Sequence, residues 1–194
     1  MSDIEPAADT DPHYAYKPSL LGAASQFWLR PGGLQWQVRA ATGLVPYGQI
    51  DRVRMSFRPV TAQSYRFLTQ VRAPDARLTI VSSSWKSMLE QERQNDAYRA
   101  FVTELHRRIS AAGGATQFVT GYSALLYWPG LAVFSATLVG FAFLILRALQ
   151  SLYWIGAAFV AAFMAFFLWQ IGGFFRRNKP SVYRPDALPP LLLP

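Results

Sequence analysis

The chain has 194 residues, a formal net charge of +8 and no cysteine. Apolar residues make up 52% of it and charged residues only 15%, a balance that argues against a disordered chain. The absence of cysteine excludes disulfides, thiolate metal sites and thiol catalysis. The length suits one soluble domain, so we expect one such domain together with a second kind of structure.

The first segment of the chain is acidic. Residues 1–19 hold four acids and one lysine and show no hydrophobic periodicity, so we expect a disordered tail there. The first twelve residues also lack the apolar core of a secretory signal peptide. We therefore expect the domain that follows to remain in the cytoplasm.

A strand-like pattern follows, from about residue 27 to residue 85. Val53, Met55 and Phe57 alternate with polar residues, which is typical of a strand with one buried face. Similar alternation occurs over residues 34–38, 65–71 and 78–80, and glycine or proline separates the runs. The pattern predicts an antiparallel meander of short strands.

An amphipathic helix is predicted next, with Asn95 or Asp96 as its N-cap. Its apolar stripe at helical spacing consists of Tyr98, Phe101, Val102, Leu105 and Ile109. The Gly113-Gly114 pair ends it. We expect this stripe to cover the sheet, and residues 115–123 to form a connector.

Two long apolar runs come after the connector. Residues 124–146 carry no charge, and residues 152–175 contain Gln170 as their only strongly polar member. At 1.5 Å per residue, each run spans about 30 Å or more, which is enough to cross a bilayer. Since neither run has a polar face, we favour a transmembrane hairpin over residues 124–175 to a buried hairpin of a soluble protein.

Basic residues flank the second run. Arg176, Arg177 and Lys179 follow it and are the predicted cytoplasmic membrane anchor, whereas the link between the runs carries only Arg147. This asymmetry predicts that both termini lie in the cytoplasm.

Small residues recur every four positions on each predicted span. The two triplets are matched in depth from the link and are predicted to form the contact between the helices: Ala132, Ala136 and Gly140 on the first span, and Ala157, Ala161 and Ala165 on the second. The alternative is that alanine is simply common in such helices. Under the packing hypothesis, Phe141, Phe143, Phe159, Phe163 and Phe166 face lipid or a partner.

The last segment, residues 176–194, is basic and then rich in proline. Proline favours an extended conformation that fits a groove, on the chain's own domain or on a neighbour. The alternative is a disordered end.

The order of strands, one amphipathic helix and a membrane hairpin resembles the bacterial pleckstrin-homology-like membrane proteins. The resemblance covers about residues 25–112 and is carried by residues 33–38, residues 47–53 and the helix around residues 98–102. It implies an α+β fold, in which an antiparallel pleckstrin-homology-like sheet over residues 20–114 is closed by one C-terminal helix and tethered to two transmembrane helices.

Arginine dominates the polar positions of the predicted strands. If the alternation holds, seven arginines point away from the buried face: Arg39, Arg52, Arg54, Arg58, Arg66, Arg72 and Arg77. Such a face suits anionic lipid headgroups or an acidic partner. The alternative is an ordinary solvated sheet face. Nucleic acid is the least favoured partner, because no reader motif is present.

No constellation for catalysis is evident. His13 and His106 have no partner at metal-ligand spacing, and no glycine-rich phosphate loop occurs. We therefore expect no enzymatic activity, no cofactor and no metal.

These observations lead to two functional hypotheses. The first is a non-enzymatic protein of the bacterial inner membrane, whose cytoplasmic domain is an anchored interaction or assembly module for a partner membrane protein or anionic lipid. Its partners would be membrane lipids and a membrane protein or a second copy of the chain, and no nucleic acid. The alternative is a small accessory subunit of a transporter or of a respiratory or photosynthetic complex, assembled through the hairpin.

Overall fold

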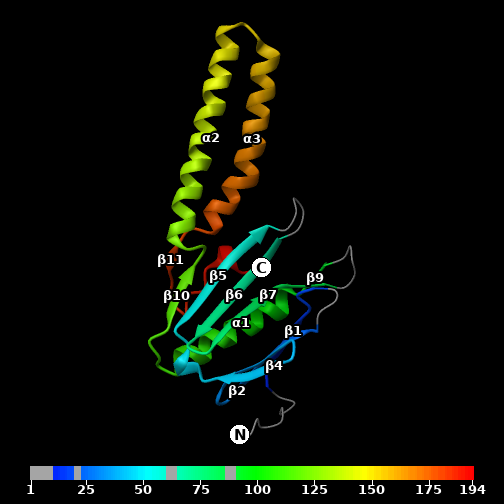
Figure 1. Cartoon of the computed structure of the whole chain (residues 1–194), viewed down its shortest axis with the longest axis vertical. Helices are drawn as coiled ribbons and strands as arrows, with labels where there is room; N and C mark the ends of the chain where they lie inside the picture. Colours follow the sequence, from blue (N-terminus) through cyan, green and yellow to red (C-terminus); the bar gives the residue numbers. More distant parts are fainter. Residues whose placement is uncertain (1–10, 20–22, 60–64, 86–90) are drawn as a thin grey trace.

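The computed structural model describes residues 11–19, 23–59, 65–85 and 91–194. It consists of a β-rich domain, with one helix of its own, and a long pair of helices that stands away from it (Figure 1). The first ten residues of the predicted acidic tail lie outside the described residues. The fold is α+β, as the sequence predicts.

The first sheet has the order β1-β2-β3-β4, and all of its pairs are antiparallel. Its strands are β1 (His13–Tyr16), β2 (Ser25–Arg30), β3 (Gly33–Val38) and β4 (Ala41–Val45). Strand β1 falls within the segment predicted to be a disordered tail. Tyr14 and Tyr16 explain the difference, because both rings are buried and the Tyr14 hydroxyl donates to the backbone oxygen of Val81 at 2.6 Å.

The second sheet has the order β11-β10-β5-β6-β7. Strands β5 (Arg52–Pro59), β6 (Tyr65–Ala73) and β7 (Ala76–Val81) are antiparallel, and Val53, Met55 and Phe57 are buried as their alternation predicts. Strand β10 (Gln117–Thr120) pairs parallel to β5. The predicted connector therefore contains a strand of this sheet. The remaining short elements are β8 (Ser83–Trp85), β9 (Gln91–Arg93) and the 3₁₀ turn η1 (Tyr47–Gln49).

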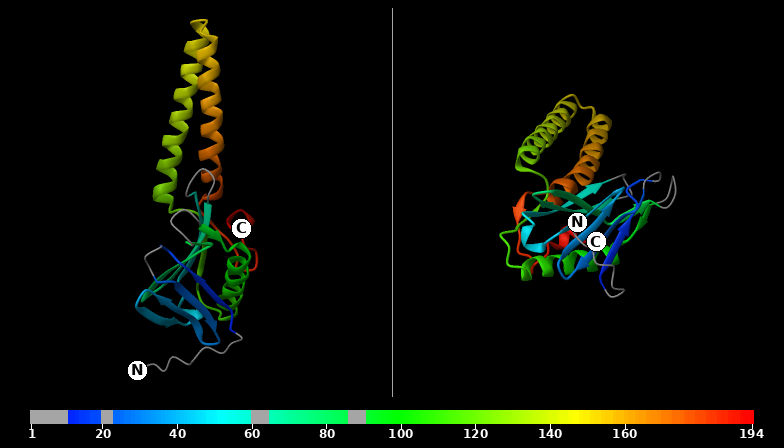
Figure 2. Two further views of the ribbon diagram at one scale, coloured as in Figure 1. Left: turned by 90° about the vertical axis from the view of Figure 1, so that its right-hand side faces the viewer. Right: turned by 60° about the horizontal axis from the view of Figure 1, so that its bottom comes forward.

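The helix of the domain, α1 (Asn95–Ala111), buries the stripe predicted for it. Tyr98, Phe101, Val102, Leu105 and Ile109 all belong to the hydrophobic core that both sheets share. The Tyr98 hydroxyl lies 2.7 Å from Thr69 Oγ1 on β6, so the helix is also tied to the second sheet by a buried hydrogen bond. Figure 2 shows α1 and the C-terminal segment on the same side of the domain.

The two remaining helices, α2 (Ala124–Gln150) and α3 (Trp154–Arg177), are long and apolar enough to cross a membrane. They extend beyond the predicted spans, to Gln150 and Arg177. In their most apolar windows, 0% of α2 and 6% of α3 is buried. A core helix of a soluble protein is mostly buried, so this exposure is consistent with membrane association.

After α3 the chain returns to the domain. Strand β11 (Ser181–Val182) pairs with β10, and the 3₁₀ turn η2 (Pro190–Leu192) places Leu192 in the core, where it is 2% exposed. The Tyr183 hydroxyl lies 2.7 Å from His106 Nε2 on α1. Of the three alternatives for the proline-rich segment, the structure shows docking onto the chain's own domain.

Asn178, immediately after α3, joins the helix pair to the second sheet. Its side chain is fully buried, accepts a hydrogen bond from the Phe57 amide at 3.0 Å and donates to the Phe57 oxygen at 2.9 Å. Across from it, Gly121 has φ +68°, and a Cβ there would overlap the backbone oxygen of Asn178. We call the contact of Asn178 with Phe57 and Gly121 the Asn178 joint.

Candidate functional site

Six of the seven predicted arginines share the outer face of the second sheet. Their strand positions alternate with the buried residues, and the register puts them on one side: Arg52, Arg54 and Arg58 on β5, Arg66 and Arg72 on β6, and Arg77 on β7. Arg39 does not belong to this face. It lies in the turn between β3 and β4 of the first sheet, with φ +56°. The alternation matches the positions of the other six arginines, but it did not show that Arg39 lies in a turn, nor which sheet each strand joins.

Five of the six arginines form two rows at opposite ends of the strands, and the sixth, Arg54, lies opposite Gln70 between them. Arg52 is paired with Arg72, and Arg72 with Arg77, so three guanidinium groups cross three adjacent strands. At the other end, Arg58 is paired with Arg66. Like charges directly opposite each other destabilise a sheet. These rows therefore cost stability unless something compensates their charge.

The chain itself compensates little of this charge. Within the described ranges, none of the six arginines has a carboxylate within ion-pair distance; the ion pairs of that part of the chain are Arg30 with Asp11, and Arg107 and Arg108 with Glu104. Arg52 Nη2 donates to Gln117 Oε1 at 2.9 Å, but its Nε is inaccessible and has no hydrogen-bond partner. Burial, and then the charge of Arg52, lower the pKa of Arg54.

The row of three arginines surrounds a hollow of about 280 Å³, which we call the arginine cradle. Six polar residues and two apolar ones line it: Arg52, Arg54, Gln70, Arg72, Arg77 and Thr79, with Val71 and Leu78, whose side chains are buried in the core. A second hollow of about 380 Å³ adjoins it and shares Arg52 and Arg72. Asp51 lines this second hollow and Asp75 lies in the β6–β7 turn, and neither pairs with an arginine of the cradle.

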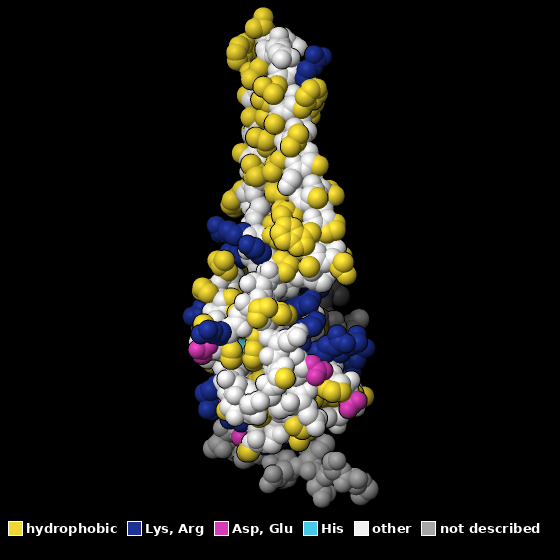
Figure 3. All heavy atoms as spheres, turned by 90° about the vertical axis from the view of Figure 1, so that its left-hand side faces the viewer, with side chains coloured by type: hydrophobic (Ala, Val, Ile, Leu, Met, Phe, Trp, Pro, Cys, Tyr) yellow, Lys and Arg dark blue, Asp and Glu magenta, His cyan; other side chains and the backbone are white. Residues whose placement is uncertain are grey.

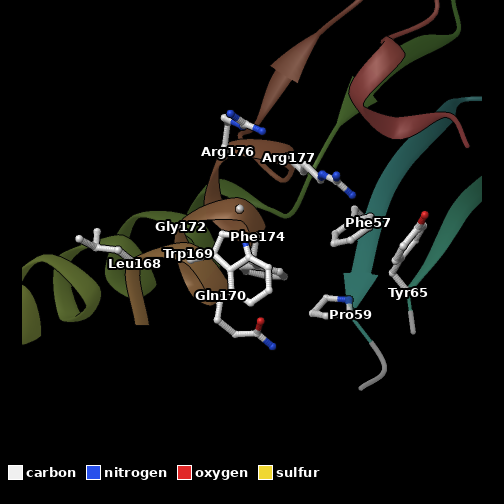
Figure 4. A pocket seen from close by; sticks show the side chains of 11 residues that line it. Phe57, Pro59, Tyr65, Leu168, Trp169, Gln170, Gly172, Phe174, Arg176 and Arg177 are labelled. Atoms are coloured by element: carbon white, nitrogen blue, oxygen red, sulfur yellow. The ribbon is translucent and has the colours of Figure 1, made fainter. Parts of the chain in front are cut away.

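A larger hollow, of about 490 Å³, lies where α3 meets the second sheet, and we call it the hairpin-base pocket (Figure 4). Phe57, Pro59 and Tyr65 line it from the sheet, and residues 168–170, 172–174, 176 and 177 line it from α3. Arg177 reaches from α3 over the Phe57 ring, 4.4 Å from its centroid. Trp169 is 73% exposed at the same level. The pocket thus combines aromatic surface with guanidinium groups.

The predicted anchor residues lie at this pocket or beside it. Arg176 and Lys179 are exposed, and Arg177 is half-buried against Phe57. Arg58 lies nearby, since its Nε donates to the Tyr122 hydroxyl at 3.0 Å just before α2. Figure 3 shows basic side chains gathered at the base of the helix pair and over the domain, below an apolar stem. Sequence reasoning found these cations but missed the pocket, because it forms between segments more than a hundred residues apart.

The structure does not bring the two small-residue triplets together. Ala132, Ala136 and Gly140 are exposed on α2; on α3, Ala157 is buried, Ala161 half-buried and Ala165 exposed. Phenylalanines form the contact instead. The ring centroids of Phe134 and Phe167 are 5.4 Å apart, and those of Phe141 and Phe163 are 5.5 Å apart.

Helix geometry explains this arrangement. Successive residues are separated by roughly 100° around the axis, so Ala132 and Ala136 lie about 200° from Phe134. When Phe134 faces α3, the triplet on α2 must face outward. Phe141 and Phe163, which were expected to face lipid or a partner, therefore face the neighbouring helix.

The two histidines have separate surroundings. His13 stacks on Trp28 at 5.0 Å between ring centroids. His106 is fully buried; its Nδ1 lies 2.7 Å from the Val102 oxygen and must be the donor there, so Nε2 accepts from Tyr183. Burial lowers the pKa of His106 to about 4. No group of three residues in the described part of the chain has the geometry of a metal site.

Comparison with known proteins shows no family for this chain. No family model matches it, and searches of curated proteins and of solved structures find no similar protein.

Proposed function

We propose that the chain is a non-enzymatic interaction module anchored in the bacterial inner membrane. The helix pair crosses the bilayer, and a pleckstrin-homology-like domain lies on the cytoplasmic side with both ends of the chain. The excess of basic residues beside the domain, compared with Arg147 alone between the helices, supports this orientation. The observation that carries the proposal is the hairpin-base pocket.

That pocket matches the headgroup region of an anionic leaflet. Trp169 is an amphipathic ring at the end of an apolar helix, a position that favours the membrane interface. Arg176 and Arg177 face the same hollow, and guanidinium groups bind phosphate oxygens in pairs. The domain thus engages an anionic phospholipid at the base of its own anchor. Each basic residue near such a surface contributes about 1 kcal/mol.

The test uses the full chain, because β1, β10 and the C-terminal segment all belong to the domain. The chain is purified from a mixture of phosphatidylglycerol and phosphatidylcholine, and the retained lipid is identified by native mass spectrometry. We expect phosphatidylglycerol to be enriched. Arg176→Gln combined with Arg177→Gln should reduce the enrichment about fivefold or more.

Arg147→Gln is the matched control, because it removes the same kind of charge at the opposite end of the helix pair. It should leave the enrichment unchanged. Equal retention of both lipids by the wild type would contradict the proposal, as would an equal loss in the Arg147 variant.

The alternative role, an accessory subunit assembled through its helices, has one observation in its favour. The triplet Ala132, Ala136 and Gly140 is exposed on α2, and small residues allow another helix to approach closely. Under this alternative, Ala136→Leu should abolish co-purification of a partner in mild detergent. Ala142→Leu, an exposed alanine on another face of α2, should not.

A further inference from the structure

The arginine cradle lies at the end of the second sheet that is remote from the helix pair. Strand β5 runs from Arg52, in the cradle, to Phe57, which contacts the base of α3 (Figure 1). Arg58 lies six positions after Arg52, which corresponds to about 20 Å along a strand. Charges in water are screened over about 8 Å at physiological salt. A lipid at the hairpin-base pocket therefore leaves the cradle uncompensated.

The arrangement of arginines in the cradle destabilises the fold. Arg52, Arg72 and Arg77 face one another across adjacent strands, and Arg54 lies on the same face one alternate position along β5. The Nε of Arg52 is withdrawn from solvent without a partner. Asp51, which lines the adjoining hollow, and Asp75, in the β6–β7 turn, form no ion pair with these arginines. A bound anion would offset the repulsion among these guanidinium groups.

The shape of the cradle limits what fits. Its volume of about 280 Å³ lies just below the range of drug-sized pockets, so the ligand must be compact. Gln70 and Thr79 add neutral hydrogen-bonding groups beside the guanidinium groups. The adjoining hollow shares Arg52 and Arg72 but is also lined by Asp51, so an anion is expected in the cradle itself. A row of planar guanidinium groups can bind several neighbouring phosphate groups. It therefore matches a compound with linked phosphates better than an isolated phosphate.

We propose that the arginine cradle binds a compact soluble anion with at least two phosphate groups, taken from the aqueous phase on the domain's side of the membrane. The two basic ends of the sheet thus have different ligands. The hairpin-base pocket contacts lipid, and the cradle contacts a dissolved phosphate compound.

Pyrophosphate is the probe for this site. The full chain is purified in an uncharged detergent at low salt, and its thermal midpoint is recorded with and without about 1 mM pyrophosphate. We expect the midpoint to rise by about 5 °C or more. Arg72→Gln and Arg77→Gln should each weaken the apparent affinity about tenfold or more, because each removes a bidentate phosphate contact.

The variants carry a second signature that a structural role would not produce. Without pyrophosphate, Arg72→Gln should have a midpoint equal to or above that of the wild type, because it relieves repulsion. Arg184→Gln, an exposed arginine on the C-terminal segment, is the matched control and should keep the full pyrophosphate response.

Three outcomes would overturn the proposal. One is a wild type indifferent to pyrophosphate, and another is an undiminished response in the Arg72 and Arg77 variants. The third comes from bilayer discs without pyrophosphate. If phosphatidylglycerol stabilises the wild type there and not Arg72→Gln, the cradle is a lipid site. Loss of lipid enrichment in the Arg176 and Arg177 variants bears only on the hairpin-base pocket, so the two proposals fail independently.

Discussion

The two ends of the second sheet carry similar arginines in different surroundings. Near the helix pair, Arg58 bonds to Tyr122, Arg177 lies over Phe57, and Asn178 satisfies both backbone groups of Phe57. Arg66 is the exception there, since its inaccessible Nε has no partner. At the remote end, the only hydrogen bond from a described arginine of the row to another side chain is that of Arg52 with Gln117. Side chains of the protein therefore hold most of the arginines at the end near the helix pair, which we call the anchored end. The arginines at the remote end largely lack such contacts.

This difference shows that the hydrogen-bond and ring contacts of an arginine, rather than its charge, indicate whether it stabilises the fold or is available to a ligand. Glu104 on α1 is an example of a carboxylate that pairs with arginines within the fold. It accepts hydrogen bonds from both Arg107 and Arg108, which lower its pKa to about 2. Arg108 also donates to the Leu29 oxygen, so these cations belong to the fold.

The largest loss of stability is expected from a substitution at Gly121, which would disrupt the anchored end of the second sheet. Gly121→Ala combines a left-handed φ of +68° with a methyl group that overlaps the backbone of Asn178. Gly113→Ala is the matched control, because its φ is +66° but its Cβ meets open space. The control should cost about 1–2 kcal/mol from backbone strain, and Gly121→Ala at least about 2 kcal/mol more. Thermal midpoints in detergent measure the difference, and equal shifts would contradict the tight contact.

The next effect tests the Asn178 joint directly. Asn178→Ala leaves the buried amide and oxygen of Phe57 without their partners, which should cost about 2–3 kcal/mol. For a chain of this size, the thermal midpoint should fall by about 4–10 °C. Lys179→Ala, the exposed neighbour, should cost almost nothing. A small effect of Asn178→Ala would mean that water replaces the side chain readily.

The smallest expected effect is a pH dependence of stability that arises from His106 on α1, which contacts Tyr183 of the C-terminal segment. Burial lowers the pKa of His106 from the ordinary histidine value of 6.5 to about 4, so the unfolded chain binds the proton first as pH falls. Its contribution to stability is therefore complete above about pH 6.5 and is lost progressively toward pH 4. The thermal midpoint should decline over this window, before Glu104 begins to lose its own contribution below about pH 4.5.

Two variants check the source of that decline. His106→Gln should abolish it between about pH 6.5 and pH 5, and His13→Gln should preserve it. The cradle should be unaffected, because guanidinium groups stay charged throughout. A decline that survives in His106→Gln would place its origin elsewhere.

Much of the architecture could be predicted from the sequence because it depends on local periodicity. Alternation placed Val53, Met55 and Phe57 inside and the six arginines outside, and the helical stripe from Tyr98 to Ile109 identified α1. The two apolar runs identified α2 and α3. These patterns report which side of an element is buried, and the core confirms them.

Pairings between distant segments could not be predicted in the same way. Nothing local in residues 117–120 indicates a parallel partner in β5, and Tyr14 and Tyr16 lie in a segment whose acids suggest disorder. Asn178 follows an apolar run and two arginines, where an anchor is the natural interpretation. The contact between α2 and α3 was predicted wrongly, and the reason is related. Small residues and phenylalanines both recur along α2, and spacing alone does not show which of them faces α3.

The docked C-terminal segment fixes the order in which the molecule can be assembled. Tyr183 and Leu192 complete the core, and both are synthesised after α2 and α3. The positions that these residues occupy against α1 and β5 therefore stay open on the nascent chain until the helix pair has left the ribosome. Where that pair enters a bilayer, the docked segment constrains its topology. Both flanks must emerge on one side, because a chain crossing once or three times would separate Leu192 from its place in the core.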